Sequence, residues 1–324
     1  MLKIRAFAAT DEEYEQIHAI RLAALPQHPM TLESFKHYDA TRNPKHPYHR
    51  DVIEKDGQLI GFGVYGQSGW SYHPDKYFWN AYVAPNHDEE EAYAVYFEHV
   101  LKTLAKHDLL GITIQSTELL PIMLQFLKDN GFVEVMRYLI SELDLATFDE
   151  NMFAGVVEKV EQSGIKIVTV AQLEKEGYDW KRKLYDLEME IAKDIPSPGD
   201  LEPMTFEIFE KQALGSPGFM AEGWFIAMDG DELVGDTALW SNGSTPNKLD
   251  TGVTGVLRSH RRRGIAMAVK LRSFEFARQY GAKVIETENE ENNPMYQINL
   301  KLGFKLVPAW LDLEKQLRDE ITTE

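Results

Sequence analysis

The sequence predicts an α/β fold (α+β in the order of its elements) built from two tandem copies of one unit. Each copy is expected to be a mixed, mostly antiparallel twisted sheet flanked by helices. The chain has 324 residues, of which 44% are hydrophobic, and domains of ~100–200 residues can each bury a core. Asp-Gly pairs begin at Asp56 and Asp229, and Gly-Phe pairs begin at Gly131 and Gly303. Landmarks that recur in the same order at an offset of 172–173 residues indicate a duplication.

The elements follow the same predicted order in both copies. An opening strand leads into helix-forming sequence, and two further strands meet at the Asp-Gly turn, which is a strong hairpin signal. Another strand then runs into a loop and a long amphipathic helix. Hairpin strands beside strands that are linked through helices predict a mixed sheet. In the second copy we expect the opening strand at 165–170, the long helix at 264–280, a short strand at 284–287 and a last helix at 293–302.

The repeat also sets the expected domain boundaries. The first copy is expected to cover 1–147 and the second 164–324. The connecting segment, 148–163, carries Phe153, Val156 and Val160 at helical spacing, so we expect a helical connector instead of a flexible linker.

Composition excludes several classes of protein. The formal charge of −18 disfavours nucleic acid as a partner, because an acidic surface repels phosphate. The absence of cysteine excludes disulfides, thiolate catalysis and Cys-ligated zinc. No run of 18 or more apolar residues predicts a transmembrane helix, and no leader pattern is seen, so we expect a cytoplasmic protein without a membrane partner. His46 and His49 lie in a Pro-containing loop, and we expect solvated histidines and no metal.

An arginine-rich turn between a strand and a helix is the most informative local feature. The strand ends at Val256, and three consecutive arginines precede Gly264, near which the long helix begins. The first N–H groups of a helix have no internal partner, and the positive end of the helix dipole lies behind them. A small residue allows an anion to approach the backbone closely. The turn therefore predicts an anion site, while a solvated basic patch is the alternative reading.

The wider pattern resembles the GCN5-related N-acetyltransferase (GNAT) family. Its acetyl-CoA loop reads Arg/Gln-x-x-Gly-x-Gly/Ala, here Arg261 to Ala266, and a later motif, usually Asn-x-x-Ala, then Tyr, then Gly-Phe, is similar to Asn292-x-x-Met295 and Gly303-Phe304. The resemblance covers about 165–315 clearly and 1–145 more faintly. Bacterial tandem members with one degenerate half, mycothiol synthase among them, have a similar layout.

The resemblance implies acetyl-CoA as co-substrate, with its diphosphate on the loop amides. The pantetheine arm would lie in a splay between the strand that ends at Val256 and the strand 284–287. Direct attack of a neutral amine on the thioester is the implied chemistry. The expected cofactor-binding residues are Val256, Leu257, Arg261, Arg262, Arg263, Gly264, Ile265, Ala266, Asn292 and Met295.

The catalytic groups are harder to assign. Counting back from Gly303, the tyrosine acid of the family falls on Asn299, which can donate a hydrogen bond but cannot give up a proton. Tyr296, one turn earlier, is the substitute that we name, with packing on the helix face as its alternative role. No base is assigned, because the carboxylates on the two strands, Asp250, Glu286 and Glu288, are expected to be solvated.

The first copy lacks the anion loop. At the offset of 173 residues, Arg261 corresponds to Asp88 and Gly264 to Glu91. Acids at a helix start stabilise the helix by about 0.3–1 kcal/mol each, but they repel phosphate. We therefore expect one acetyl-CoA per chain, in the second copy, and a degenerate first copy that either walls the acceptor pocket or only supports the fold.

The acceptor is expected to be a primary amine of a small molecule or peptide. Asp194 and Glu202 lie in an acidic, Pro-containing loop that would face the acceptor, so we expect both to attract a cationic amine. Two rival functions remain: a non-catalytic acetyl-CoA-binding sensor or scaffold, and an acyltransferase that uses a larger acyl-CoA. The duplication could supply the pairing that single-domain relatives achieve by dimerising, which favours a monomer.

Overall fold

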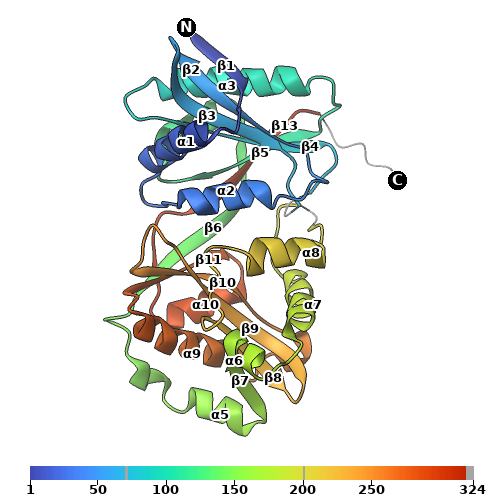
Figure 1. Ribbon diagram of the computed structural model, residues 1–324, viewed down its shortest axis with the longest axis vertical. Helices are drawn as coiled ribbons and strands as arrows, with labels where there is room; N and C mark the ends of the chain where they lie inside the picture. The colour runs from blue at the N-terminus through green and yellow to red at the C-terminus, as the bar shows by residue number, and fades with distance from the viewer. Residues whose placement is uncertain (70–71, 200, 319–324) are drawn as a thin grey trace. The chain divides into compact units, whose positions relative to one another are not determined.

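The computed structural model describes residues 1–69, 72–199 and 201–318. It divides the chain into two compact units (Figure 1). Unit 1 contains Met1–Tyr138, the short segment Ser197–Pro203 and the C-terminal segment from Pro308 onward, while unit 2 contains Leu139–Pro196 and Met204–Val307. The predicted α/β class with mixed sheets is confirmed.

Unit 1 is a seven-stranded mixed sheet with helices on both faces. The strands lie in the order β1-β2-β3-β4-β5-β13-β6, and every neighbouring pair is antiparallel except β4 and β5. The elements are β1 (Leu2–Ala6), α1 (Asp11–Ala24), α2 (Leu32–Ala40), β2 (Tyr48–Lys55), β3 (Gln58–Gly66), β4 (Lys76–Val83), α3 (Glu89–Leu104), β5 (Gly111–Thr117), α4 (Pro121–Asp129), the first half of β6 (Val133–Asp144) and β13 (Trp310–Gln316).

Neighbouring residues of β2 point to opposite faces of this sheet, and their contacts show which helices cover each face. Val52 belongs to a cluster with Ile17 of α1 and Phe35 of α2. Ile53 belongs to a second cluster with residues of α3 and α4, among them Phe126. The alternation of successive side chains across a strand explains the division. The predicted hairpin at Asp56 and Gly57 forms with positive φ at both residues, which is the geometry that type I′ turns require.

Unit 2 repeats this plan. Its strands lie in the order β7-β8-β9-β10-β11-β6-β12, with β10 and β11 parallel. The connector that the sequence predicts at 148–163 contains η1 and α5. The elements are η1 (Glu150–Phe153), α5 (Val156–Gln162), β7 (Ile165–Thr169), α6 (Val170–Lys175), α7 (Trp180–Ala192), α8 (Phe206–Phe209), η2 (Glu210–Leu214), β8 (Trp224–Asp229), β9 (Glu232–Ser241), β10 (Lys248–Val256), η3 (Arg258–His260), α9 (Ile265–Tyr280), β11 (Val284–Glu290), α10 (Pro294–Lys301) and β12 (Lys305–Leu306).

The helices of unit 2 also divide between the two faces of the sheet. Ile226 packs in a cluster with Leu173 of α6 and Leu184 of α7, whereas Ala227, its neighbour on β8, packs with Val160 of α5 and with residues of α9. Helix α7 therefore covers one face of the sheet and α9 covers the other. The strands β9 and β10, from which the candidate site is built, lie between these two helices.

The units are not the contiguous segments that the repeat predicts. Unit 1 takes β13 from the C-terminal end of the chain and inserts it between β5 and β6, while in unit 2 the second half of β6 lies between β11 and β12. The compact units therefore differ from the predicted ranges 1–147 and 164–324, whose last residues, 319–324, lie outside the described part of the chain. A repeat in sequence marks where copies begin, but it does not say which sheet each closing strand joins.

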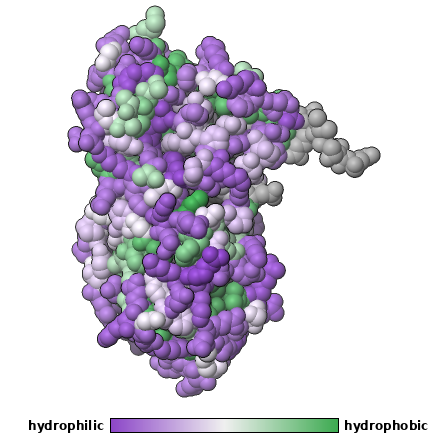
Figure 2. Space-filling model, turned by 45° about the vertical axis from the view of Figure 1, so that its right-hand side comes forward, coloured by the Kyte–Doolittle hydropathy of each residue, from purple (hydrophilic) through white to green (hydrophobic). Residues whose placement is uncertain are grey.

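The surface is mostly hydrophilic, with small scattered hydrophobic patches on the face that Figure 2 shows. Within the described residues, no helix is both long and apolar enough to span a bilayer. A group of three or more His, Asp or Glu side chains that could hold a metal ion is likewise not found among them.

Candidate functional site

The junction between β10 and α9 exposes the start of a helix. Gly264 caps α9 with φ of +83°, a conformation that glycine adopts without steric cost, and Arg262 has φ of +64°. No side chain caps this helix, and its first internal hydrogen bond runs from the Ala268 N–H to the Gly264 carbonyl. The amide groups that precede Ala268 are therefore available to an anion, with the positive end of the helix dipole behind them.

A cavity of about 590 Å³ opens beside this helix start, entirely within unit 2. The structure brings seven of the ten predicted cofactor residues to its wall: Val256, Arg261, Arg262, Gly264, Ile265, Ala266 and Met295. Asn293, Pro294 and Ile298 of the α10 region complete that side. Asn293 lines the cavity, whereas the residue predicted from the sequence to bind the cofactor is its neighbour Asn292.

The other three predicted cofactor residues do not line this cavity. Leu257 packs against the apolar clusters of unit 2. Arg263 pairs with Asp229 and donates to a backbone carbonyl of the α5 region. Asn292 donates to the side chain of Glu290. The three side chains are engaged elsewhere in the same unit.

The two parallel strands β10 and β11 separate beyond a short paired segment. The pairing of β10 with β11 covers only three positions and ends at Asp250 opposite Glu286, while both strands continue. The register of β10 against β9 shifts between Thr251 and Thr254, and such a bulge bends a strand and locally increases its twist. Thr254 and the next two residues of β10 line the cavity. The geometry leaves the edge groups of both strands open to an extended ligand.

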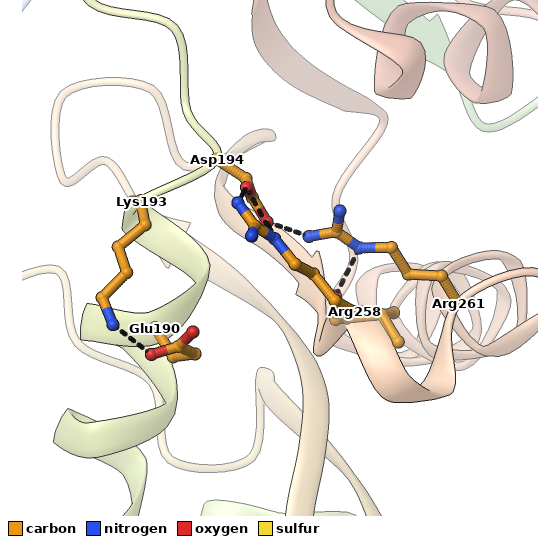
Figure 3. A network of polar contacts seen from close by, with 6 residues as sticks. Glu190, Lys193, Asp194, Arg258 and Arg261 are labelled. Atoms are coloured by element: carbon orange, nitrogen blue, oxygen red, sulfur yellow. Dashed lines mark hydrogen bonds and ion pairs between the residues drawn. The ribbon is translucent and has the colours of Figure 1, made fainter.

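Two arginines of the loop region converge on one carboxylate. Arg258 and Arg261 both bind Asp194, and Arg261 also donates to the Val256 carbonyl at 3.0 Å (Figure 3). Hydrogen bonds from the two guanidinium groups lower the pKa of Asp194 to about 2. Because Asp194 lines the cavity, the loop presents arginine charge that is partly neutralised.

Asp194 and Glu202, which the sequence grouped together, lie in different units. Glu202 belongs to unit 1, where it binds Lys45 and lies 3.3 Å from Nε2 of His46. The His46 side chain is buried, so the expectation of a solvated loop histidine is wrong; the reason is that the segment Ser197–Pro203 packs in this unit.

Replacing Asp194 by asparagine should tighten acetyl-CoA binding about two- to fivefold at low salt. An exposed ion pair contributes about 0–1 kcal/mol, so the freed arginines offer a modest gain toward phosphate, which salt should screen. Calorimetric titration at two ionic strengths measures the change. The Glu190→Gln variant is the matched control, because Glu190 pairs with Lys193 one turn away and does not line the cavity. Weaker binding in the Asp194→Asn variant would instead mean that Asp194 orders the arginines.

Neither predicted catalytic residue lines the cavity. Asn299 is 1% exposed, and its Nδ2 donates to Oδ1 of Asn289 at 2.5 Å. Tyr296 is half-buried in the first turns of α10. A catalytic role for either residue stays a prediction, and the structure gives Asn299 an interior partner.

A carboxylate that the sequence treated as solvated is half-buried at the end of the paired part of β10. Burial, and then the negative charge of Glu286, raise the pKa of Asp250 to about 6, while Lys248 opposes the shift. Glu286 shares Lys248 with Glu142, which lies 2.8 Å from the lysine nitrogen. Asp250 is thus a titratable group near neutral pH at the mouth of the splay. Asp250 could be named from the sequence because it lies on one of the two strands that are predicted to separate. The burial of its side chain could not be predicted from the sequence.

A second acidic pair lies between α7 and β9. Asp236 is fully buried and accepts from the indole N–H of Trp224 at 2.8 Å. Glu188 of α7 hydrogen-bonds to Asp236, and burial together with the neighbouring negative charge raises the pKa of Glu188 well above its usual value. The protonated form of Glu188 is therefore favoured more than that of an exposed glutamate. Asp236 lies opposite Gly255, which lines the cavity, so this acidic pair belongs to the wall behind the site.

The comparison with protein families matches residues 183–304 to the acetyltransferase (GNAT) family. This range contains the loop, α9 and the whole cavity wall. The likeness to this family is therefore a property of residues 183–304, which are less than half of the chain. Members of this family use an acyl-CoA and an acceptor, so the comparison supports the predicted co-substrate class. A search of curated proteins finds no match.

Solved structures with similar folds extend the likeness to the whole chain. A tandem GNAT protein from the clavulanic acid biosynthesis pathway, solved without AcCoA, has 18% identity and a TM-score of 0.74, with 99% of this chain and 100% of that one covered. A GCN5-related N-acetyltransferase from Sphaerobacter thermophilus has 16% identity and a TM-score of 0.65, with 99% and 97% covered. At these identities the likeness shows the fold, including the tandem arrangement.

Proposed function

We propose that this protein is an N-acetyltransferase that transfers the acetyl group of acetyl-CoA to a primary amine of a small molecule or peptide. We place the active site in the second copy. The observation that carries the proposal is the cavity at the uncapped start of α9, within the part of the chain that matches the acetyltransferase family.

The residues of the cavity suit the parts of acetyl-CoA. Amide groups at the start of α9, together with Arg261 and Arg262, would hold the diphosphate. Gly255 lets Ile191 pack closely against β10 at the cavity wall, because a Cβ there would lie 2.3 Å from Cγ2 of Ile191. Apolar side chains of α10, Met295 and Ile298, would contact the arm along the splay.

The bound co-substrate supplies a thioester carbonyl that the amine nitrogen attacks, so that the C–N bond forms, the C–S bond breaks and the coenzyme leaves as thiolate. We propose that Asp250 accepts the proton that the amine loses. A carboxylate with a pKa near 6 is deprotonated at neutral pH and is still a stronger base than a solvated aspartate. A thiol pKa near 8.5 makes the thiolate a tolerable leaving group without a dedicated acid.

Replacing Asp250 by asparagine should lower kcat about 10²–10⁴-fold, the range typical of a lost general base. The wild-type kcat/KM should fall as pH decreases through about 6, because protonation removes the base, and the variant should lack this acidic limb. The assay follows release of the coenzyme A thiol with a panel of primary amines. Asp231→Asn, which alters an exposed carboxylate on the β8–β9 turn, is the control. An unchanged pH profile in the Asp250→Asn variant would remove Asp250 from the mechanism.

One acetyl-CoA per chain follows from the equivalent helix of unit 1. The side chain of Asp88 caps α3 by accepting the Glu91 N–H at 2.9 Å, and Glu89, Glu90 and Glu91 fill the first turn. This helix start is both capped and negative, and it therefore repels a diphosphate. We propose that unit 1 is the degenerate copy.

A non-catalytic acetyl-CoA-binding protein is the second candidate, and the interior position of Asn299 favours it. Binding of acetyl-CoA without thiol release from any amine would support this alternative. Faster thiol release from a longer acyl thioester would instead identify a larger donor. We retain a monomeric, cytoplasmic protein as part of the proposal, with the oligomeric state to be measured by sedimentation.

A further inference from the structure

The strands β9 and β10 place the proposed base and an aromatic ring on one face of the sheet of unit 2. Asp250 of β10 lies directly opposite Trp240 of β9 in the antiparallel ladder. Side chains at directly opposite positions share a face, with Cβ atoms about 4.5–5.5 Å apart. Trp240 packs in the cluster that contains residues of α7, whereas its neighbour Leu239 packs in the cluster of α9. Asp250 therefore lies on the face that α7 covers, beside the indole of Trp240.

A group of aromatic rings surrounds Trp240 on this face. Its ring centroid lies 5.6 Å from that of Trp224 and 6.4 Å from that of Phe219. Phe219 is held there because the carbonyl of its neighbour Gly218 accepts the Ser241 N–H at 3.0 Å. Trp224 is buried, but Trp240 and Phe219 each keep part of their surface exposed. The lysines and arginines that lie over rings in the described part of unit 2 do so at other aromatic residues, so these two rings stay available to a ligand.

Gly252 allows the indole of Trp240 to lie across β10. A Cβ at this position would lie 2.4 Å from Nε1 of Trp240, a separation that real Cβ atoms do not show. The register of β10 against β9 shifts in the same segment, between Thr251 and Thr254. The ring therefore lies within two residues of Asp250, just beyond the last position at which β10 pairs with β11.

The charges around Asp250 favour an amine. Lys248 is shared by Glu286 and Glu142, so it balances only one of these two carboxylates. Asp250 adds a further negative charge, and among the described residues neither a hydrogen bond nor a second cation contributes to the shift of its pKa. The site thus attracts an ammonium group, whose neutral form is the nucleophile of the proposed reaction.

The rest of this wall favours an apolar body over a sugar. Val253, the next residue of β10 that packs on the α7 side, is aliphatic and partly exposed. The hydroxyl groups of a sugar need hydrogen-bond partners when water is removed, whereas an aromatic ring needs none. Rings and an aliphatic side chain therefore suit an aromatic body.

We infer that the acceptor of the proposed reaction is a primary amine that carries an aromatic ring, with the amine at Asp250 and the ring against Trp240 and Phe219. Because the carboxylate and the indole come from opposite residues of one ladder, a link of about two carbons between amine and ring suits their spacing. This inference rests on the proposed function, since it narrows the primary amine of that reaction to one class.

The test compares phenethylamine with ethylamine, which lacks the ring, by following release of the coenzyme A thiol from acetyl-CoA with the full chain. The wild-type kcat/KM should be about 10–100-fold higher for phenethylamine, chiefly through KM, because burial of a phenyl group favours binding by that factor. In Trp240→Leu this advantage should fall about five- to tenfold, whereas Trp240→Phe, which keeps a ring, should retain most of it. Tyr280→Leu, which alters an exposed ring at the end of α9 outside this cluster, is the control.

Gly252→Ala gives an independent reading that leaves Trp240 in place. The new Cβ would displace the indole, so the advantage of phenethylamine should fall as it does in Trp240→Leu. Thermal unfolding of each variant excludes misfolding as the cause. Equal wild-type kcat/KM for the two amines, a higher value for glucosamine than for phenethylamine, or an advantage that survives in both variants would overturn the inference and leave the transferase function intact.

Failure of the proposed function gives a different result, namely no thiol release from any amine. Calorimetric titration of the full chain with phenethylamine and with ethylamine then decides about the site itself. Phenethylamine should still bind at least tenfold more tightly than ethylamine to the wild type, and this difference should shrink in Trp240→Leu. Equal binding of the two amines would overturn the inference as well.

Discussion

A Gly264→Asp variant should lose measurable acetyl-CoA binding. The new carboxylate would lie where the diphosphate is expected, and two unit charges ~4 Å apart repel by about 4 kcal/mol at an effective dielectric of 20. In the wild type, a ligand at 100 times its Kd stabilises the fold by roughly 2.7 kcal/mol. The unfolding midpoint should therefore rise by about 5–10 °C with acetyl-CoA, and this rise should vanish in the variant.

Two controls isolate the charge from the strain of a side chain at positive φ. Gly264→Asn introduces a side chain of the same size that tolerates the left-handed conformation, and it should retain most of the acetyl-CoA shift. Gly281→Asp places the same carboxylate at the other end of α9, where φ is also positive and a Cβ meets no atom within 4 Å. If the Gly264→Asp variant keeps the full shift, or if the wild type has none, the loop is only a basic surface.

Replacing Lys270 by methionine should raise the unfolding midpoint at pH 7 by about 10 °C. Lys270 of α9 is 1% exposed, its Nζ has no hydrogen-bond partner among the described residues, and it lies 5.5 Å from the centre of the Phe304 ring. Burial lowers the pKa of this amine to about 7. The difference from the usual lysine value of ~10.4 corresponds to roughly 4–5 kcal/mol of lost stability, which an apolar side chain of similar length removes.

The pH dependence gives this prediction a distinct signature. Between about pH 7 and 10.4 the unfolded chain binds a proton at this lysine that the folded chain does not, so the wild type gains stability as pH rises. The difference between wild type and the Lys270→Met variant should be largest at and below pH 7 and should close near pH 10. Lys301→Met, at an exposed position of α10, is the control. A variant that is no more stable than wild type at pH 7 would show that Lys270 stays charged and solvated.

Local features of the candidate site could be predicted from sequence because neighbouring residues produce them. Gly264 and the arginines before it specify a turn with positive φ and a helix start, which need only a few consecutive residues. Seven of the ten residues chosen on that basis line one cavity. The Asp-Gly turn at Asp56 likewise forms the hairpin that its residues favour. These features depend on backbone preference over short distances.

Features that depend on distant contacts were missed. Asp194 and Glu202 are eight positions apart in the chain, but the first binds arginines of unit 2 and the second binds Lys45 of unit 1. Asp250 looked solvated because strand periodicity does not reveal what packs over a residue at the end of a paired segment. Asn299 matched the position of a catalytic tyrosine, yet it hydrogen-bonds to Asn289 in the interior.

The sequence by itself determined the α/β class, the duplication, the loop before α9 and the acidic replacement of that loop in the first copy. Each of these follows from the order, the spacing and the charge of residues along the chain. Only the tertiary structure decided that β13 closes the sheet of unit 1 and that Asp250 and Lys270 are withdrawn from water. Strand partners and burial arise from contacts between residues far apart in the chain, and such contacts set the free energy of a charge through the water that they remove.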